Sequence, residues 1–253
     1  MGHKYHYGLI GKQLSHSFSQ NYFEEKFASE SLSGYSYELI ELESLNELKQ
    51  IADEKELDGF NVTIPYKVEM LPLLDDIDDT ARKIGAVNCV KVIREDVEVR
   101  LKGYNTDAPA FADTLQNSKF DIRNSKALIL GTGGAAQAVA YGLEMLGIEY
   151  MYVSRNPSHS NIQDSVIGYD EAYQLTDEYT IIVNATPVGM FPNSSCSPWT
   201  HPELLTNRHI CYDLIYNPSP TRFMQEAAMR GATVQDGLPM LHRQAELSWE
   251  IWQ

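Results

Sequence analysis

The chain has 253 residues, which is enough for one or two domains with a packed core. Its 35 acidic and 20 basic side chains give a formal net charge of −15, which argues against nucleic acid or an anionic membrane as the main partner. No apolar stretch approaches the roughly 20 residues of a membrane span, and the first residues lack the apolar core of a signal peptide, so we expect a cytoplasmic protein.

The first hundred residues alternate between strand-like and helix-like patterns. Runs of β-favouring residues predict strands at 4–10, 37–42 and 59–64, and helical stripes follow the first two at 18–27 and 45–52. Residues 71–84 are expected to form helices with an acidic, solvated surface. Residues 88–93 and 97–101 are expected to pair as a hairpin that turns at 94–96.

Three polar side chains gather around the third predicted strand. Asn61 and Thr63 are two residues apart and therefore share one face, and Lys67 follows just beyond the carboxyl end of the strand. In a parallel sheet this end binds ligands, so these residues are candidates for a polar ligand site. Hydrogen bonding of Asn61 and Thr63 to neighbouring loops is the alternative.

Two further segments offer polar groups where a strand gives way to a helix. Residues 13–19 (QLSHSFS) hold three hydroxyls after the first strand, and one of these serines could instead cap the helix that follows. Residues 103–107 (GYNTD) precede a helical pattern, so Asp107 could be no more than a helix-start residue.

Residues 127–155 predict the strand, turn, helix and strand of a dinucleotide site. The first apolar run stops at Gly131-Thr132-Gly133-Gly134-Ala135-Ala136, a helical pattern follows, and a second apolar run ends at Arg155. In such a turn Gly131 bends the chain, Gly133 lets the backbone approach a pyrophosphate, and Ala136 permits close helix-to-strand packing. The unpaired N–H groups at the start of the helix attract the anion.

The end of the second apolar run favours NADP as the cofactor. An NAD site usually has an acidic residue there for the ribose, whereas a 2′-phosphate needs a cation. The chain has Ser154-Arg155-Asn156, in which Arg155 can form a bidentate pair with a phosphate and Ser154 and Asn156 can add hydrogen bonds. A solvated arginine is the alternative.

The last third of the chain continues the strand and helix pattern. Residues 156–168 are expected to form a loop, residues 179–184, 210–215 and 233–235 strands, and residues 221–229 and 240–252 helices. Cys89, Cys196 and Cys211 lack the spacing of a disulfide framework or a zinc site, so we expect buried, reduced thiols and no metal.

Taken together, seven motifs resemble the shikimate dehydrogenase family along essentially the whole chain. They are His16-Ser17-Phe18-Ser19, Asn61-Val62-Thr63-Ile64-Pro65-Tyr66-Lys67, Gly85-Ala86-Val87-Asn88, Gly103-Tyr104-Asn105-Thr106-Asp107, Gly131-Thr132-Gly133-Gly134-Ala135, Asn184-Ala185-Thr186-Pro187-Val188-Gly189-Met190 and Gln244-Ala245. The Asn-Val-Thr…Pro…Lys and Asn-Thr-Asp elements are the specific ones.

The resemblance implies a fold, an activity and a set of site residues. It implies an N-terminal α/β substrate domain, residues 1–105 with 237–253, and a Rossmann-type doubly wound NADP domain, residues 106–236, with a cleft between them. It implies NADP-dependent interconversion of 3-dehydroshikimate and shikimate by a monomer or homodimer. Lys67 and Asp107 would be the catalytic pair. The implied substrate ligands are Ser17, Ser19, Asn61, Thr63, Asn88, Tyr216 and Gln244, and the implied cofactor ligands are Gly131, Thr132, Gly133, Gly134, Ala135, Ser154, Arg155, Thr186, Met190 and Gly237.

One departure and two alternatives accompany this interpretation. Members of the family often carry a second basic residue shortly after the arginine, where this chain has Pro157-Ser158-His159-Ser160, which weakens the case for strict NADP selectivity. A quinate/shikimate dehydrogenase that accepts NAD or NADP, or a non-catalytic nucleotide sensor, are the competing functions. Tyr22 and Lys26 match the Tyr-x-x-x-Lys of short-chain dehydrogenases, but they precede the glycine turn, and we read them as ordinary helix residues.

Overall fold

The computed structural model describes residues 4–14, 17–95, 98–118, 120–159, 162 and 166–253, so His16 and Ser160 of the sequence motifs and residues 96–97 of the predicted turn lie outside it. The chain divides into two compact units, Met1–Thr106 with Ala245–Gln253, and Asp107–Gln244. The second break therefore falls within the last helix, α9 (Leu238–Trp252), whose residues 238–244 group with the second unit.

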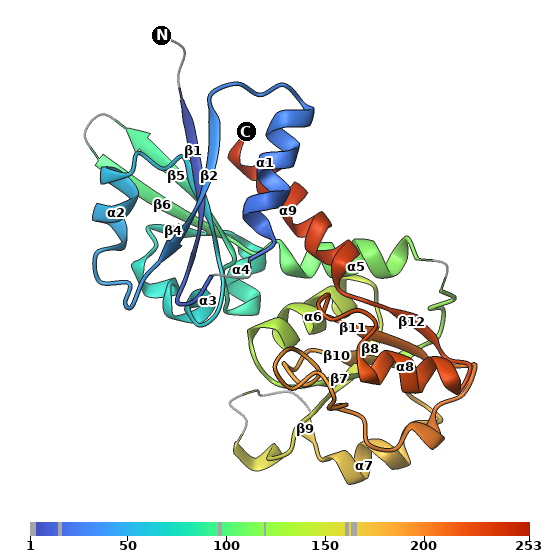
Figure 1. The fold of residues 1–253 in the computed structure, drawn as a ribbon. Helices are drawn as coiled ribbons and strands as arrows, with labels where there is room; N and C mark the ends of the chain where they lie inside the picture. The colour runs from blue at the N-terminus through green and yellow to red at the C-terminus, as the bar shows by residue number, and fades with distance from the viewer. Residues whose placement is uncertain (1–3, 15–16, 96–97, 119, 160–161, 163–165) are drawn as a thin grey trace. The chain divides into compact units, whose positions relative to one another are not determined.

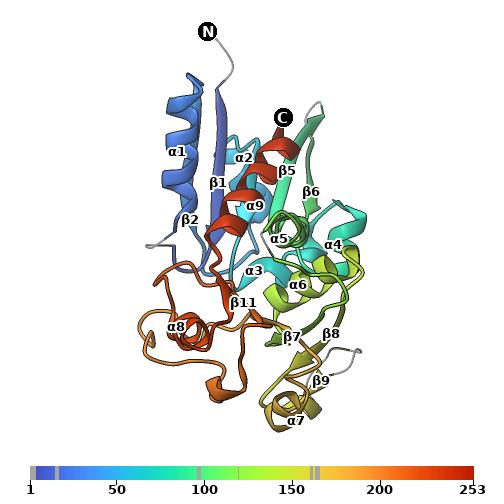
Figure 2. The same cartoon turned by 90° about the vertical axis from the view of Figure 1, so that its right-hand side faces the viewer.

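The first unit is built on a mixed sheet of six described strands (Figures 1 and 2). Its strand order is β2-β1-β3-β5-β6-β4. β1 pairs in parallel with β2 and β3, whereas β5 is antiparallel to both β3 and β6. The strands are β1 (Tyr5–Gly11), β2 (Tyr35–Glu41), β3 (Gly59–Val62), β4 (Asp76–Ile77), β5 (Cys89–Glu95) and β6 (Glu98–Tyr104).

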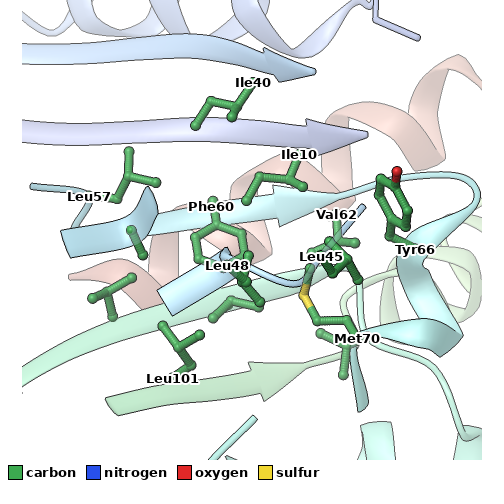
Figure 3. Close-up of a cluster of buried hydrophobic side chains, with 14 of the residues drawn as sticks. Ile10, Ile40, Leu45, Leu48, Leu57, Phe60, Val62, Tyr66, Met70 and Leu101 are labelled. Carbon is green, nitrogen blue, oxygen red and sulfur yellow. The ribbon is translucent and has the colours of Figure 1, made fainter. Parts of the chain in front are cut away.

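Alternate residues of β1 and its neighbours enter two different cores. Leu9 packs in a cluster with α1 (Ser19–Ser29) and the end of α9, while Ile10, the next residue, faces a cluster with α2 (Leu48–Glu54). Figure 3 shows the second cluster, in which Phe60 of β3 lies among aliphatic side chains. This alternation follows from the two-residue period of a strand, so both faces of the sheet are covered.

The segment 71–84 differs from the expected helices. After the short α3 (Tyr66–Glu69) it forms a 3₁₀ turn (Leu71–Leu73), then β4, then α4 (Asp79–Ile84). β4 pairs in parallel with β6, and the Nζ of Lys102 lies 2.9 Å from a carboxylate oxygen of Asp76. A strand of two residues is too short to show an alternating hydrophobic pattern in the sequence. Pairing with the adjacent strand β6 determines its conformation.

The second unit is a Rossmann-type, doubly wound parallel sheet. Its order, β12-β11-β10-β7-β8-β9, reverses direction between β7 and β10, and every described pair is parallel. Ligands of such sheets bind at this switch point, at the carboxyl ends of the strands. The strands are β7 (Lys126–Leu130), β8 (Glu149–Val153), β9 (Val166–Ile167), β10 (Ile181–Asn184), β11 (Ile210–Asp213) and β12 (Thr233–Gln235).

Helices cover both faces of this sheet. α5 (Asp107–Gln116) and α6 (Gly134–Met145) share one face, where the rings of Phe111 and Tyr212 lie 5.1 Å apart. A Cβ on Gly142 of α6 would lie 2.9 Å from the carbonyl oxygen of Ala108, so glycine permits the close approach of the two helices. α7 (Tyr169–Gln174) and α8 (Arg222–Met229) contribute Ala172 and Phe223 to the core on the other face.

Three further details differ from the sequence interpretation or add to it. The expected loop 156–168 contains a 3₁₀ turn (Pro157–His159) and β9, and α7 was not predicted. Cys89 and Cys211 are buried, but Cys196 is exposed because it lies in a polar loop, so the expectation of three buried thiols was wrong for Cys196. Among the residues described here, no helix is long and apolar enough to cross a membrane, and no cluster of three acidic, histidine or cysteine side chains could hold a metal ion.

Candidate active site

The end of β3 positions Thr63 and Lys67. The backbone N–H of Thr63 donates to the carbonyl oxygen of Ile10 at 2.9 Å, which ties the chain to the end of the parallel neighbour β1. Lys67 lies on α3, and its carbonyl oxygen accepts a hydrogen bond from the N–H of Val87 at 2.8 Å. Both side chains are half-buried. The predicted placement of Lys67 just beyond the carboxyl end of the strand is therefore observed.

Asn61 is almost fully buried inside the first unit, and both polar atoms of its amide make hydrogen bonds. Its Oδ1 accepts a hydrogen bond from the Tyr37 hydroxyl at 2.9 Å. Its Nδ2 donates to the Ser248 hydroxyl at 2.8 Å and to the carbonyl oxygen of Asn88 at 3.3 Å. The hydrogen bonding to neighbouring groups, which was the alternative for Asn61, is therefore present. Its role as a substrate ligand stays a prediction.

Asn88 connects the start of β5 to the residue that precedes Asp107. Its Oδ1 accepts the backbone N–H of Thr106 at 2.7 Å, and its Nδ2 donates to the Thr106 hydroxyl at 2.9 Å. Asp107 is the first residue of α5 and is 8% exposed. It therefore starts a helix, and the Asn88–Thr106 pair fixes the backbone from which its side chain projects.

Ser17 and Ser19 lie where the chain enters α1. The Ser17 hydroxyl accepts the backbone N–H of Ser19 at 3.3 Å. The N-cap of α1 is Phe18, with no side-chain cap among the described residues, so the expected serine cap was wrong. Burial raises the pKa of the Tyr37 phenol well above its usual value, and a hydrogen bond from Ser19 lowers it in part. Tyr37 thus stands between Ser19 and Asn61, two of the predicted substrate ligands.

The glycine turn between β7 and α6 has the geometry of a phosphate cradle. Gly131 has a φ of +111°, and a Cβ there would lie 3.1 Å from the Thr186 side chain. At Gly133, by contrast, no described heavy atom lies within 4 Å of an added Cβ. α6 begins directly after it at Gly134, so the first turn of the helix starts beside this open position. This fits a dinucleotide pyrophosphate.

A hydrogen-bond network holds the loop on the other side of the switch point. The side-chain Oδ1 of Asn184, at the end of β10, accepts both the backbone N–H and the hydroxyl of Thr186, at 3.0 and 2.7 Å. The Asn184 Nδ2 donates to the buried carboxylate of Asp213 at 2.9 Å. Thr186 therefore lies against Gly131, whereas Met190, further along the loop, is 48% exposed.

The end of β8 presents Ser154 and Arg155. The Ser154 hydroxyl accepts the backbone N–H of Asn156 at 3.1 Å, which tightens the turn after the strand. Arg155 is exposed. Because β8 neighbours β7, this turn and the glycine turn lie at the same edge of one sheet.

The remaining predicted residues lie after β11 and β12. A Cβ on Gly237 would lie 2.0 Å from the carbonyl oxygen of Leu214, so only glycine fits there. Tyr216 is half-buried, and burial raises the pKa of its phenol. Gln244 is 9% exposed, and its Nε2 donates to the carbonyl oxygen of Leu241 one turn earlier in α9.

Tyr22 and Lys26 both bind the carboxylate of Glu246. The Tyr22 hydroxyl donates to the carboxylate of Glu246, and the Lys26 Nζ lies 2.9 Å from the same carboxylate. Burial and Glu246 raise the pKa of the Tyr22 phenol, which opposes ionisation. These contacts join α1 to α9, in agreement with ordinary helix residues.

Three residues of these networks were not singled out from the sequence: Tyr37, Asp213 and Ser248. Tyr37 and Asp213 lie within predicted strands, and nothing in the local pattern distinguishes them from other strand residues. Ser248 could have been found, because it lies four residues after Gln244 and therefore on the same face of the predicted helix.

Known proteins match the chain over nearly its whole length. Residues 9–90 match the family model described as the shikimate dehydrogenase substrate binding domain. A shikimate dehydrogenase (NADP(+)) of Clostridium beijerinckii is 38% identical over 98% of this chain and 91% of its own length.

Two solved structures share the fold. The shikimate 5-dehydrogenase of Thermus thermophilus in complex with NADP(H) and shikimate has a TM-score of 0.84 at 35% identity, covering 98% of this chain and 93% of that one. The shikimate 5-dehydrogenase of Listeria monocytogenes in complex with shikimate and NAD has a TM-score of 0.85 at 28% identity, covering 100% and 92%. The chain belongs to the shikimate dehydrogenase family.

Proposed function

We propose that the chain catalyses the reversible, NADP-dependent reduction of 3-dehydroshikimate to shikimate, a step of aromatic amino acid biosynthesis. The observation that carries this proposal is the arrangement around β3. Lys67 lies on α3 directly after Asn61 and Thr63, at the ligand-binding end of a strand whose backbone is tied to β1. The relatives that share this chain's length carry the same activity in their names.

The proposed substrate ligands suit a polyhydroxylated ring carboxylate. Hydroxyl and amide side chains predominate among them, and each substrate hydroxyl needs a partner when it leaves water. Asn61 and Asn88 are held by buried hydrogen bonds, so they would meet the substrate without a large loss of conformational entropy. The full set is Ser17, Ser19, Asn61, Thr63, Asn88, Tyr216 and Gln244.

Lys67 and Asp107 are the proposed catalytic pair. When bound, the nicotinamide supplies the hydride that reduces the ring carbonyl. The Lys67 ammonium donates a proton to the carbonyl oxygen as it becomes a hydroxyl, and it accepts that proton in the reverse direction. Asp107 orients the ammonium and accepts a hydrogen bond from a substrate hydroxyl. Because Lys67 also stabilises negative charge on that oxygen, its effect is greatest in the transition state.

The second unit supplies the proposed cofactor site. The open space at Gly133 and the start of α6 fit the pyrophosphate, and Arg155 with Ser154 would bind the 2′-phosphate. The other proposed cofactor ligands are Gly131, Thr132, Gly134, Ala135, Thr186, Met190 and Gly237.

A steady-state assay tests the proposal. The purified chain is incubated with shikimate and NADP while the absorbance of the reduced nicotinamide is followed, and Lys67→Ala is the matched control. We expect turnover by the natural chain and a strong loss in the variant. Binding of NADP without any turnover of shikimate would contradict the proposal and favour a nucleotide sensor.

The same assay addresses dual cofactor use and quinate oxidation. No lysine or arginine follows Arg155 within residues 156–160, and the Listeria relative was solved with NAD and shikimate. Rates with each cofactor and with quinate in place of shikimate separate these functions. A specificity constant for quinate equal to that for shikimate would assign the broader activity.

A further inference from the structure

α9 carries a hydroxyl, that of Ser248, which is completely enclosed in the first unit. The side chain is 0% exposed, and its Oγ accepts a hydrogen bond from the Asn61 Nδ2 at 2.8 Å. The Thr106 hydroxyl lies 3.4 Å away. Burial raises the pKa of the Cys89 thiol to about 12, and a hydrogen bond from Ser248 acts in the opposite direction. One hydroxyl thus contacts a residue of β3, a residue of β5 and the residue that precedes Asp107.

The contacts of Asn61 fix which way its amide points. The carbonyl oxygen of Asn88 can only accept a hydrogen bond, so the atom 3.3 Å from it must be the Asn61 nitrogen. The second hydrogen on that nitrogen is directed to Ser248, and the Asn61 oxygen therefore faces the Tyr37 hydroxyl. Because the nitrogen has only two hydrogens, the oxygen is the atom of Asn61 that keeps capacity for a ligand, as an acceptor.

Thr106 extends the network toward Asp107. Its hydroxyl accepts from the Asn88 Nδ2 at 2.9 Å, and its own hydrogen has two acceptors within reach, the Asn88 Oδ1 at 3.3 Å and the Ser248 Oγ at 3.4 Å. The next residue in the chain is Asp107. Ser248 is thus one step from the backbone that presents the proposed catalytic carboxylate.

We propose that Ser248 is a positioning residue, which holds the Asn61 amide in the orientation that accepts a substrate hydroxyl. This inference rests on the proposed function, because Asn61 is a ligand only if the chain binds shikimate. An alanine at this position would fill most of the same volume but would leave one Asn61 N–H without its acceptor. The amide could then recover a partner only by moving, and the buried unsatisfied donor has a substantial free-energy cost.

The test compares Ser248→Ala and Ser248→Cys with a control that removes an equally buried hydroxyl elsewhere. Thr176→Val is that control, since the Thr176 hydroxyl is buried in the second unit and bonds to carbonyl oxygens of α7. For each variant we would measure the Michaelis constants for shikimate and NADP, the turnover number and the melting temperature.

We expect both Ser248 variants to raise the Michaelis constant for shikimate roughly tenfold, with turnover changed less and the constant for NADP unchanged. Thr176→Val should lower the melting temperature without altering either constant. The cysteine variant fills the site with a slightly larger side chain whose sulfur accepts hydrogen bonds only weakly, and it tests the inference if the alanine variant does not fold.

Two results separate the failure of this inference from that of the proposed function. Unchanged constants for shikimate in folded Ser248 variants of an active enzyme would overturn the positioning role alone. A natural chain that shows no turnover of shikimate would overturn the proposed function and this inference with it.

Discussion

Asn184 and Asp213 are direct register partners on β10 and β11, and the amide of Asn184 donates to the Asp213 carboxylate at 2.9 Å. The backbone N–H of Ile215 shares the same carboxylate oxygen, and the Thr221 hydroxyl donates to the other one at 2.7 Å. Through this pair, the fully buried Asp213 holds the loop that carries Thr186 beside the glycine turn. A buried structural carboxylate thus supports the loop of the proposed cofactor site.

Asp213 predicts a pH dependence of stability. Burial raises the pKa of its carboxyl from 3.8 to about 6, despite the three donors. Because the folded-state pKa lies above the unfolded value, the folded chain binds the proton more tightly, and this contribution to stability is complete below about pH 4 and is lost as the pH rises to about 6. Two pKa units correspond to about 3 kcal/mol in the free energy of unfolding.

Asp213→Asn isolates that contribution. Its oxygen can accept from Asn184 and Ile215, so two of the three contacts are kept, while the Thr221 hydroxyl loses its acceptor. The variant is therefore less stable by a constant amount, but it has no titrating group at this position. The free energy of unfolding in urea, measured between pH 4 and 8, should fall for the natural chain relative to the variant as the pH rises to 6, and the difference should then be constant. Parallel curves for the two proteins would show that the Asp213 pKa is not raised.

Arg155 predicts the cofactor preference. If it pairs with the 2′-phosphate, Arg155→Ala should raise the Michaelis constant for NADP by roughly 10- to 100-fold and that for NAD little, as is typical of a charge-assisted contact. Arg123→Ala is the control, because Arg123 is another exposed arginine of the same unit and pairs with Asp121. If Arg155→Ala changed the Michaelis constants for NADP and NAD equally, Arg155 would not be a ligand of the 2′-phosphate.

Gly133 has open space beside it and Gly237 is tightly enclosed, so we expect an alanine to affect stability only at Gly237. Gly133→Ala places its methyl group in open space, so the melting temperature should not change, while NADP binding should weaken because that space would hold the pyrophosphate. Gly237→Ala places it 2.0 Å from the Leu214 carbonyl oxygen, so the backbone must shift and the melting temperature should fall by several degrees. Thermal unfolding and cofactor titration of both variants check this, and undiminished NADP affinity in Gly133→Ala would remove Gly133 from the site.

The sequence predicted best those elements whose pattern is local. The predicted strand at 127–130 and the helix after the glycine turn agree with the bounds of β7 and α6 to within a few residues. The position of Lys67 beyond the end of β3 follows from the predicted strand alone. β4 could not be predicted, because its two residues adopt a strand only through pairing with β6.

The hydrogen-bond partners of the site residues could not be predicted either, because they are distant in the sequence. Ser248 is 187 residues from Asn61, and Asp213 is 29 residues from Asn184, so their hydrogen bonds exist only once the sheets have formed. Periodicity shows which face a side chain is on, but it does not show which distant group completes its hydrogen bonds. The polar residues were therefore found, whereas the residues that orient them were not.

Lys67 and Asp107 give the sharpest test of the proposed chemistry. If Lys67 delivers the proton and stabilises charge on the substrate oxygen, Lys67→Ala should lower the turnover number on the order of a hundred- to ten-thousandfold while weakening shikimate binding far less. Asp107→Ala should also lower turnover, and the double variant should be little worse than the poorer single one, because the two groups act as a unit. Cofactor affinity, measured by titration, should barely change in any of the three. A Lys67→Ala enzyme with near-normal turnover and only a raised Michaelis constant for shikimate would make Lys67 a binding residue, and another group would then have to donate the proton.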